Sequence, residues 1–338
     1  MLEGALKTPD ALNRQSRRYG LPYKGSKNSI AEWVVSELPS SDVFVDLFFG
    51  GGAITHCAML SGKWGQFIAN DIDPRLTVLF KECALGKHTI ENHPEWVSRE
   101  DFFRLKGDAF YALVWSFGNN GVDYMYSKEI EPFKKALHYA SFFEDVSLFR
   151  ELGIDIPQYE EIKGPYNRYQ KYRRYLEAQH SQDELHRFER LQSIEVLQSL
   201  QSLQSLHLDY EEAIEKVKES FDQFLIYCDP PYNSTRCGKY SGFDNDRFIK
   251  WARDQDNIYI SEYDMPEDFI PIAWKKKQVL SDGFDNSKFA IEKIYTNERT
   301  YEKFTRGQKM NASLNFSEQM NIFDFMGDPY KDREMSNE

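Results

Sequence analysis

Short apolar runs recur along the chain, and stretches typical of helices lie between most of them. Runs of this length, bounded by turn residues, predict buried strands. The expected strands are Val43–Leu47, Gln66–Asn70, Leu206–Leu208, Phe224–Cys228, Ile258–Glu262, Lys277–Leu280 and Ile291–Tyr295. The expected helices are Asn28–Glu37, Pro74–Leu85, Glu211–Ser220 and Asp244–Arg253. Strands that alternate with helices indicate an α/β fold, with a mostly parallel sheet and helices on both faces.

The alternation stops between about residues 106 and 205. This stretch is rich in tyrosine, phenylalanine and charged residues but has no clear strand, which predicts a second domain inserted between sheet elements. Within it, Leu-Gln-Ser occurs at 191–193, 197–199, 200–202 and 203–205. Leucines at every third position drift around a helix, so we interpret the repeat as a helix with several neighbours or a variable spacer. After about Thr305 the sequence becomes polar, which predicts a loose tail.

The composition narrows the class of protein. The chain has 338 residues, of which 41% are hydrophobic and 15% aromatic, enough for one large core or two small ones. No apolar run approaches the roughly 18 residues that a membrane span needs, and the first 16 residues carry no apolar signal segment. Four cysteines show neither zinc spacing nor a disulfide framework, and no histidine cluster indicates a metal, so we expect a reduced, cytoplasmic protein without a metal site.

The charge pattern bears on nucleic acids. A net charge of −12 argues against a protein that coats nucleic acid generally, but it leaves room for a local basic groove. Basic residues gather at Arg14, Arg17, Arg18, Lys24 and Lys27, and again at Arg168, Lys171, Arg173 and Arg174.

A glycine-rich turn and an acid suggest a cofactor site. The run Val45-Asp46-Leu47-Phe48-Phe49-Gly50-Gly51-Gly52-Ala53 leads from a strand into a helix-like segment, and Asp71 ends the next strand. Glycines let the backbone approach a ligand, and an acid at that place binds ribose hydroxyls in nucleotide-binding sheets. The pair implies an adenosine-containing cofactor. The chain lacks Gly-x-Gly-x-x-Gly there and lacks a P-loop, which argues against dinucleotides and triphosphates.

Two further segments carry candidate chemistry. Asp229-Pro230-Pro231-Tyr232 follows the strand Phe224–Cys228, at the carboxyl end where open α/β sheets bind ligands. Tyr23-Lys24-Gly25-Ser26-Lys27 precedes the first expected helix. By itself this second segment is explained by a turn in which Ser26 or Asn28 caps the helix.

Taken in order, these segments resemble the Dam-type DNA adenine methyltransferases, which use S-adenosylmethionine (SAM). Tyr23 and Lys27 resemble the amino-terminal cofactor motif of the family. The phenylalanine–glycine motif is matched by Asp46, Phe48, Gly50 and Gly52, and the ribose-binding acid is matched by Asp71. Asp209-Tyr210 is similar to the pair that flanks the cofactor adenine, and Asp229-Pro230-Pro231-Tyr232 matches the catalytic motif, in which Asp229 also adjoins the cofactor. The likeness spans roughly residues 17 to 300 and implies a Rossmann-like fold with a mixed seven-stranded sheet plus an inserted, mainly helical target-recognition domain.

The resemblance also implies an organisation for the chain. Residues 1–16 would form an amino-terminal tail, 17–105 the SAM-binding part, 106–205 the inserted recognition domain, 206–305 the catalytic part, and 306–338 the polar tail. Two departures stand out. Leu47 replaces a usual proline, and the loop Trp115–Tyr124 has no arginine where the family's loop is rich in Arg and Asn, which argues against a GATC target.

The implied chemistry is methyl transfer to the 6-amino group of adenine in duplex DNA. Asp229 and the Pro230 carbonyl would accept hydrogen bonds from the amino group, Pro231 would keep the turn rigid, and Tyr232 would stack on the base after it flips out. The alternatives are another amino nitrogen (cytosine in DNA, adenine in RNA, a protein amide) or a catalytically silent DNA-binding regulator. Motif order and the intact tetrapeptide favour the adenine methyltransferase.

The DNA contacts are predicted from two places. The first is the loop with Asn119, Asn120 and Tyr124. The second is the row Arg168, Lys171, Arg173 and Arg174, interleaved with tyrosines at 166, 169, 172 and 175. Basic and aromatic residues suit phosphate contact and stacking, but an amphipathic helix with a tyrosine packing face explains the row equally well.

We expect a monomer. Gln319–Phe323 resembles a sliding-clamp docking peptide, although an apolar anchor for the tail explains it more simply.

Overall fold

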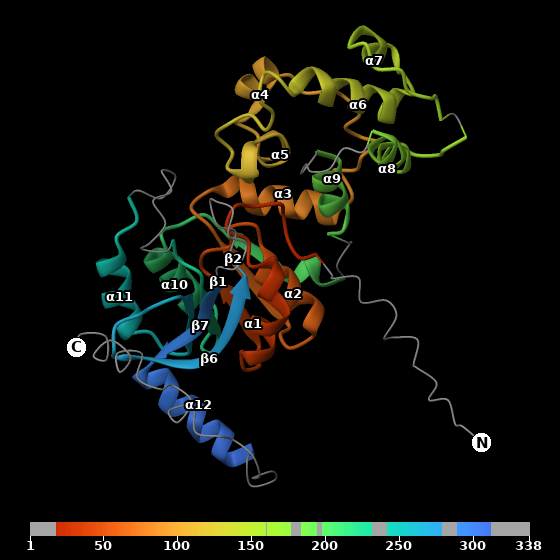
Figure 1. The fold of residues 1–338 in the computed structure, drawn as a ribbon. Helices are drawn as coiled ribbons and strands as arrows, with labels where there is room; N and C mark the ends of the chain where they lie inside the picture. The colour runs from red at the N-terminus through yellow and green to blue at the C-terminus, as the bar shows by residue number, and fades with distance from the viewer. Residues whose placement is uncertain are drawn as a thin grey trace, which may run out of the picture.

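The computed structural model describes residues 18–159, 161–176, 184–194, 198–231, 242–278 and 289–311. Its centre is a seven-stranded sheet with the order β3-β2-β1-β4-β5-β7-β6 (Figure 1). The strands are β1 (Val43–Asp46), β2 (Gln66–Asn70), β3 (Leu203–Leu206), β4 (Leu225–Cys228), β5 (Ile258–Glu262), β6 (Phe269–Gln278) and β7 (Phe289–Asn297). The first five of these run parallel, while β7 is antiparallel to both β5 and β6. This mixed sheet confirms the expected Rossmann-like α/β fold.

Alternate residues of the strands pack against opposite layers of helices. In β1, Val43 and Val45 contact the layer that contains α10 and α11, while Phe44 packs with α1, α2 and α3. Both faces are covered, so the strands read as continuous apolar runs. The helices before and after the insertion are η2 (Asn28–Ile30), α1 (Ala31–Glu37), α2 (Ala53–Ser61), α3 (Pro74–Ala84), α10 (Tyr210–Lys218), α11 (Asn245–Arg253) and α12 (Glu298–Asn311).

The register of the parallel strands brings three loops to one edge. Asp46, the last residue of β1, pairs with Ala69 of β2 and with Tyr227 of β4. The segments that follow these strands therefore begin at the same edge of the sheet. They contain the glycine turn, Asp71 and the Asp229-Pro230-Pro231 sequence.

A helical insertion, here Arg99–Gln192, lies between α3 and β3 and stands apart from the sheet in Figure 1. It contains α4 (Arg99–Leu105), α5 (Ala109–Val114), η3 (Phe117–Asn119), α6 (Glu131–Phe143), α7 (Ser147–Glu151), α8 (Pro165–Tyr175) and α9 (Glu184–Gln192). Helices α5 and α9 pack on α3, and one apolar cluster runs from the sheet into the insertion. The helices thus begin before the boundary expected at residue 106, and this end of the insertion shares its core with the sheet.

Four details differ from the expected elements. Strand β3 begins at Leu203 rather than Leu206, so the last Leu-Gln-Ser repeat is an edge strand and not part of a helix. The preceding repeat lies in the short 3-10 helix η4 (Gln198–Ser202). Strand β6 begins at Phe269, ahead of the expected 277–280 run. Helix α12 continues to Asn311, so the tail does not start at Thr305.

Some expectations concern residues outside the described ranges. Tyr232, Cys237 and the Gln319–Phe323 segment lie there. Within the described ranges, no helix has both the length and the apolar character needed to cross a membrane.

Candidate active site

A cleft of about 980 Å³ opens at the carboxyl ends of β1, β2 and β4. Its volume is at the upper end of the roughly 300–1,000 Å³ that small-molecule sites occupy. Most of the site residues expected from the sequence line it: Tyr23, Lys27, Asp46, Phe48, Gly50, Asp71, Asp209, Tyr210, Asp229, Pro230 and Pro231. The structure therefore brings together five segments that are far apart in the sequence.

The glycine turn holds the amino-terminal segment against the sheet. The Leu21 amide donates to the Gly51 carbonyl at 2.7 Å. A Cβ on Gly51 would lie 2.6 Å from the Tyr23 Cβ, so only glycine permits this approach. Gly52 differs from the prediction because it does not line the cleft; with φ +69 it precedes α2, and a Cβ there would meet the Phe49 ring at 2.3 Å.

Asp71 organises the turn at the end of β2. One carboxylate oxygen accepts the Gly50 amide at 2.7 Å and the other accepts the Asp73 amide at 2.9 Å. Both oxygens of the Asp71 carboxylate therefore hold main-chain amides of this turn. Asp71 thereby joins the glycine turn to the next strand and remains at the cleft wall.

Two aromatic side chains, Phe48 and Tyr210, form one wall of the cleft. Tyr210 is buried, and its ring centroid lies 5.8 Å from that of Phe48. Asp209 caps α10 through the Glu211 amide and also binds Arg247, whose two terminal nitrogens lie 3.0 and 3.2 Å from its oxygens. No signal in the sequence singled out Arg247, because a lone arginine in the first turn of a helix such as α11 is typical of a solvated face.

At the other end, the Lys27 ammonium lies between two carboxylates. It is 2.8 Å from Asp229 and 3.2 Å from Glu292, which is fully buried on β7. Burial alone would lower the pKa of Lys27, but the two carboxylates outweigh it and the pKa is raised. Lys27 therefore stays charged and fixes the position of Asp229. Glu292 was not foreseen, because nothing in the pattern of β7 distinguishes an inward-facing acid.

Negative charge dominates the floor of the cleft. Asp46 is 2% exposed, and its Oδ2 accepts the Thr55 hydroxyl at 2.7 Å, while Oδ1 has no hydrogen-bond partner among the described residues. Burial, and then the nearby charges of Asp229 and Asp71, raise the pKa of Asp46 to about 7. Outside the lining of this cleft, at the end of β5, burial together with Asp229 also raises the pKa of Glu262 to about 8. A cationic ligand would reduce the electrostatic cost of ionising these buried carboxylates.

His56 has a structural role in holding the amino-terminal segment. It is 2% exposed, its Nδ1 accepts the Gly20 amide at 3.0 Å, and burial lowers its pKa to about 4. Among the described residues, no group of three or more His, Cys, Asp or Glu side chains could hold a metal ion.

The residues expected to contact DNA divide into three groups. Asn119 and Asn120 line the cleft rim, together with Val122 and Asp123. Lys171 and Arg174 are exposed on α8, and Arg173 is half-buried. Tyr124 and Arg168 are buried, which argues against the predicted contacts.

Each of the two buried residues has a partner inside the protein. The Tyr124 hydroxyl donates to the Val97 carbonyl at 2.8 Å. The Arg168 guanidinium donates to the carbonyls of Ser141, Ile162 and Phe142 at 2.6, 3.1 and 3.2 Å, and it also pairs with Glu144. Tyr169 and Tyr172 are buried as well, so the packing interpretation holds for this face of α8.

The fold is Rossmann-like, and a cleft lined by several acidic residues opens at the carboxyl edge of its sheet. The family of D12 class N6 adenine-specific DNA methyltransferases matches residues 23–255, and the chain belongs to it. The resemblance found in the sequence is thus confirmed, and the protein is an adenine-specific DNA methyltransferase. A comparison with curated proteins finds no match.

Proposed function

We propose that the protein transfers a methyl group from SAM to the 6-amino nitrogen of an adenine that flips out of a specific duplex site. The family supports a methyl donor and a DNA adenine as substrate. The identity of the donor, the flipped base and site specificity are our inference from the cleft.

The charge of the cleft carries the proposal. Asp46, Asp71, Asp209 and Asp229 all line it, and the last two are paired with cations, Arg247 and Lys27 respectively. One oxygen of buried Asp46 lacks a hydrogen-bond partner among the described residues. SAM supplies an activated methyl group on a cationic sulfonium and also carries an ammonium. Cations suit an acidic, partly desolvated site, whereas a triphosphate would be repelled. Asp46 would hold the ammonium, Asp71 the ribose, and the Phe48–Tyr210 wall the adenine ring.

The chain's own residues would prepare the amino nitrogen for attack. Its lone pair is delocalised into the adenine ring, which makes it a weak nucleophile. Hydrogen bonds from the amino group to Asp229 and to the Pro230 carbonyl favour a pyramidal nitrogen with a directed lone pair. Lys27 holds the Asp229 carboxylate at 2.8 Å, so this acceptor is fixed before the substrate arrives.

We also assign target recognition to the helical insertion, in agreement with the domain expectation. It supplies Asn119, Asn120, Val122 and Asp123 to the cleft rim, while Phe117 on the same loop is 67% exposed. Lys171 and Arg174 of α8 would contact phosphates.

Mass spectrometry of nucleosides tests the proposal. Unmethylated duplex DNA incubated with the protein and SAM should yield N6-methyladenine, and Asp229→Ala should lower the rate by at least about 10²-fold while the protein stays folded. Asp155→Asn, an exposed acid in the insertion, is the matched control and should keep the wild-type rate. Methylcytosine as the product, or near wild-type rates in Asp229→Ala, would refute the assignment.

A further inference from the structure

Helix α9 carries two arginines one turn apart, and each holds a different functional segment. Arg187 and Arg190 stand three positions apart, so their side chains lie on the same face of the helix. In Figure 1, α9 lies beside α3, and it packs on both α3 and the insertion helix α5. It is thus placed to touch both halves of the molecule.

Arg187 holds the start of the rim loop, here residues 116–124. Its Nη1 donates to the carbonyls of Val114 and Ser116, the latter at 2.7 Å. The loop then closes on itself through a bridge between Ser116 and Tyr124 and a bond from the Phe117 amide to the Asp123 carbonyl at 2.8 Å. A shift of Arg187 would therefore move the segment that supplies Asn119 and Asn120 to the cleft.

Arg190 holds the amino-terminal segment. Its Nε donates to the Gly20 carbonyl at 3.1 Å, and its Nη2 donates to the Tyr19 carbonyl at 3.1 Å and to the Ser26 hydroxyl at 3.0 Å. These bonds bracket Tyr23, which lines the cleft, and they end next to Lys27. The same segment contacts the glycine turn through the bond from Leu21 to Gly51.

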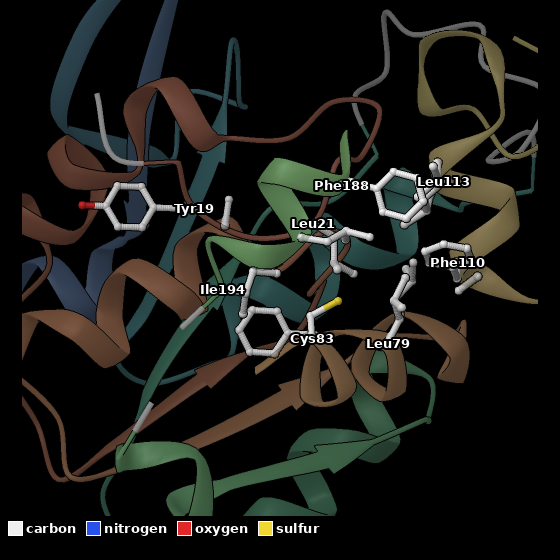
Figure 2. Packing of buried hydrophobic residues seen from close by; sticks show 14 of the residues in the cluster. Tyr19, Leu21, Leu79, Cys83, Phe110, Leu113, Phe188 and Ile194 are labelled. Atoms are coloured by element: carbon white, nitrogen blue, oxygen red, sulfur yellow. The ribbon is translucent and has the colours of Figure 1, made fainter. Parts of the chain in front are cut away.

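Apolar side chains on α9 anchor the two arginine contacts in the core. Phe188 and Leu191, each next to one of the arginines, are buried, and the Phe188 ring lies 5.6 Å from Phe110 of α5. Figure 2 shows Phe188 beside Leu113, the residue before Val114, and Leu21 between Phe188 and Ile194. The rim loop and the Tyr19–Lys27 segment are therefore both held by helix α9. They can be linked through this helix without contacting each other directly.

The contacts of Arg190 are costly for a purely packing role. The partners of its guanidinium among the described residues are uncharged, and burial lowers its pKa to about 10, with a further contribution from Arg18. An apolar side chain would fill this space at a lower desolvation cost. The planar fork of arginine, however, fixes several acceptors in one geometry.

We propose that Arg187 and Arg190 are positioning residues that couple DNA binding at the rim loop to SAM binding at the Tyr19–Lys27 segment. The inference rests on the proposed function. By linkage, DNA on the loop would tighten cofactor binding, and cofactor would tighten DNA binding by the same factor. Neither arginine is required to touch a ligand.

Calorimetry with sinefungin, a SAM analogue that cannot donate methyl, measures the coupling in the full-length protein. The DNA is an unmethylated 500-bp duplex, chosen after the nucleoside assay described above shows that the wild type methylates it. We expect the wild-type Kd for sinefungin to fall about 5-fold or more when DNA is saturating. Arg190→Gln should raise the Kd without DNA and abolish the DNA effect. Arg187→Gln should leave the Kd without DNA near wild type and also abolish the DNA effect.

The control is Arg168→Gln, which removes another buried guanidinium from main-chain carbonyls in the insertion but away from both segments. It should lower Tm and keep the coupling. If either glutamine variant fails to fold, Arg187→Lys and Arg190→Lys keep the charge and lose the fork, and the coupling factor should fall toward one in both.

The outcomes separate the two proposals. A wild type that binds sinefungin and methylates DNA but shows no coupling, or variants with wild-type coupling, would overturn the role of α9 alone. A wild type that binds no sinefungin would overturn the proposed function, and the coupling with it.

Discussion

The carboxyl edge of the sheet and helix α8 of the insertion were both expected to carry functional residues, but they use their charged side chains differently. At the sheet edge, Asp46, Asp71 and Asp229 face one cleft. On α8, Arg168 is buried against main-chain carbonyls, while Lys171 and Arg174 are exposed. Charged residues in a sequence motif therefore identified a cleft in the first region. In the second region, they proved to be partly buried packing residues and partly exposed surface residues.

The difference arises from how each element presents its side chains. Residues that follow adjacent parallel strands must meet at one edge, so order along the chain predicts where they gather. Residues spaced by three on a helix drift around its axis, so a basic and aromatic row is divided between core and solvent. Motifs at strand ends thus locate a site more reliably than a composition pattern on a helix.

The sharpest test of the sheet edge is Asp46. A cation binds its ionised form, and its pKa in the ligand-free protein is about 7. Sinefungin affinity should therefore rise as the pH increases through 7 and fall roughly tenfold per unit below it, with proton release near pH 6. Asp46→Asn should weaken binding by about 100-fold at pH 8 and flatten this dependence. Calorimetry between pH 5.5 and 8.5 measures both effects, and a flat wild-type profile would contradict the assignment.

A smaller effect is expected at the glycine turn. Gly51→Ala places a Cβ 2.6 Å from the Tyr23 Cβ and must displace that segment. An overpacking cost of about 1–3 kcal/mol should appear as a KM for SAM raised about fivefold or more. Steady-state methylation measures it. Gly107→Ala, which has open space around it, is the control and should leave KM unchanged; equal KM values for all three proteins would show that Tyr23 does not shape the cofactor site.

The smallest effect concerns α8 and asks whether its exposed and buried cations differ in function. Lys171→Gln and Arg174→Gln should each reduce the slope of log K against log salt by about 0.9, if each contacts one phosphate. Arg168→Gln should leave the slope unchanged but lower stability by about 1–3 kcal/mol, because buried acceptors lose their donor. DNA-binding titrations from 50 to 200 mM salt, with thermal melts alongside, would decide. A slope change only in Arg168→Gln would reverse our view of this helix.

The cofactor half of the fold was largely predictable from the sequence. The central strands are buried on both faces, so β1, β2, β4 and β5 stand out as apolar runs, and their order places the three loops that follow β1, β2 and β4. The edge strands were less visible. Strand β3 consists of Leu-Gln-Ser-Leu, and β6 contains Pro271 and three consecutive lysines, features that suit an unpaired edge but hide a strand.

The unpredicted part of the site depends on contacts across long sequence separations. Arg247, Glu292, Arg187 and Arg190 belong to no local motif. Arg247 contacts Asp209, and Glu292 contacts Lys27. Arg187 contacts the rim loop, and Arg190 contacts the amino-terminal segment. Each of these contacts forms only in the folded chain. Spacing along a single sequence holds no signal for such pairs.

The position of Glu292 has a consequence for the order in which the enzyme matures. Lys27 is synthesised well before Glu292, which lies on β7, beyond the family's match to residues 23–255. During synthesis the cofactor half is complete in sequence long before the second carboxylate on Lys27 exists. A nascent chain therefore lacks the second carboxylate partner of Lys27 until β7 joins the sheet.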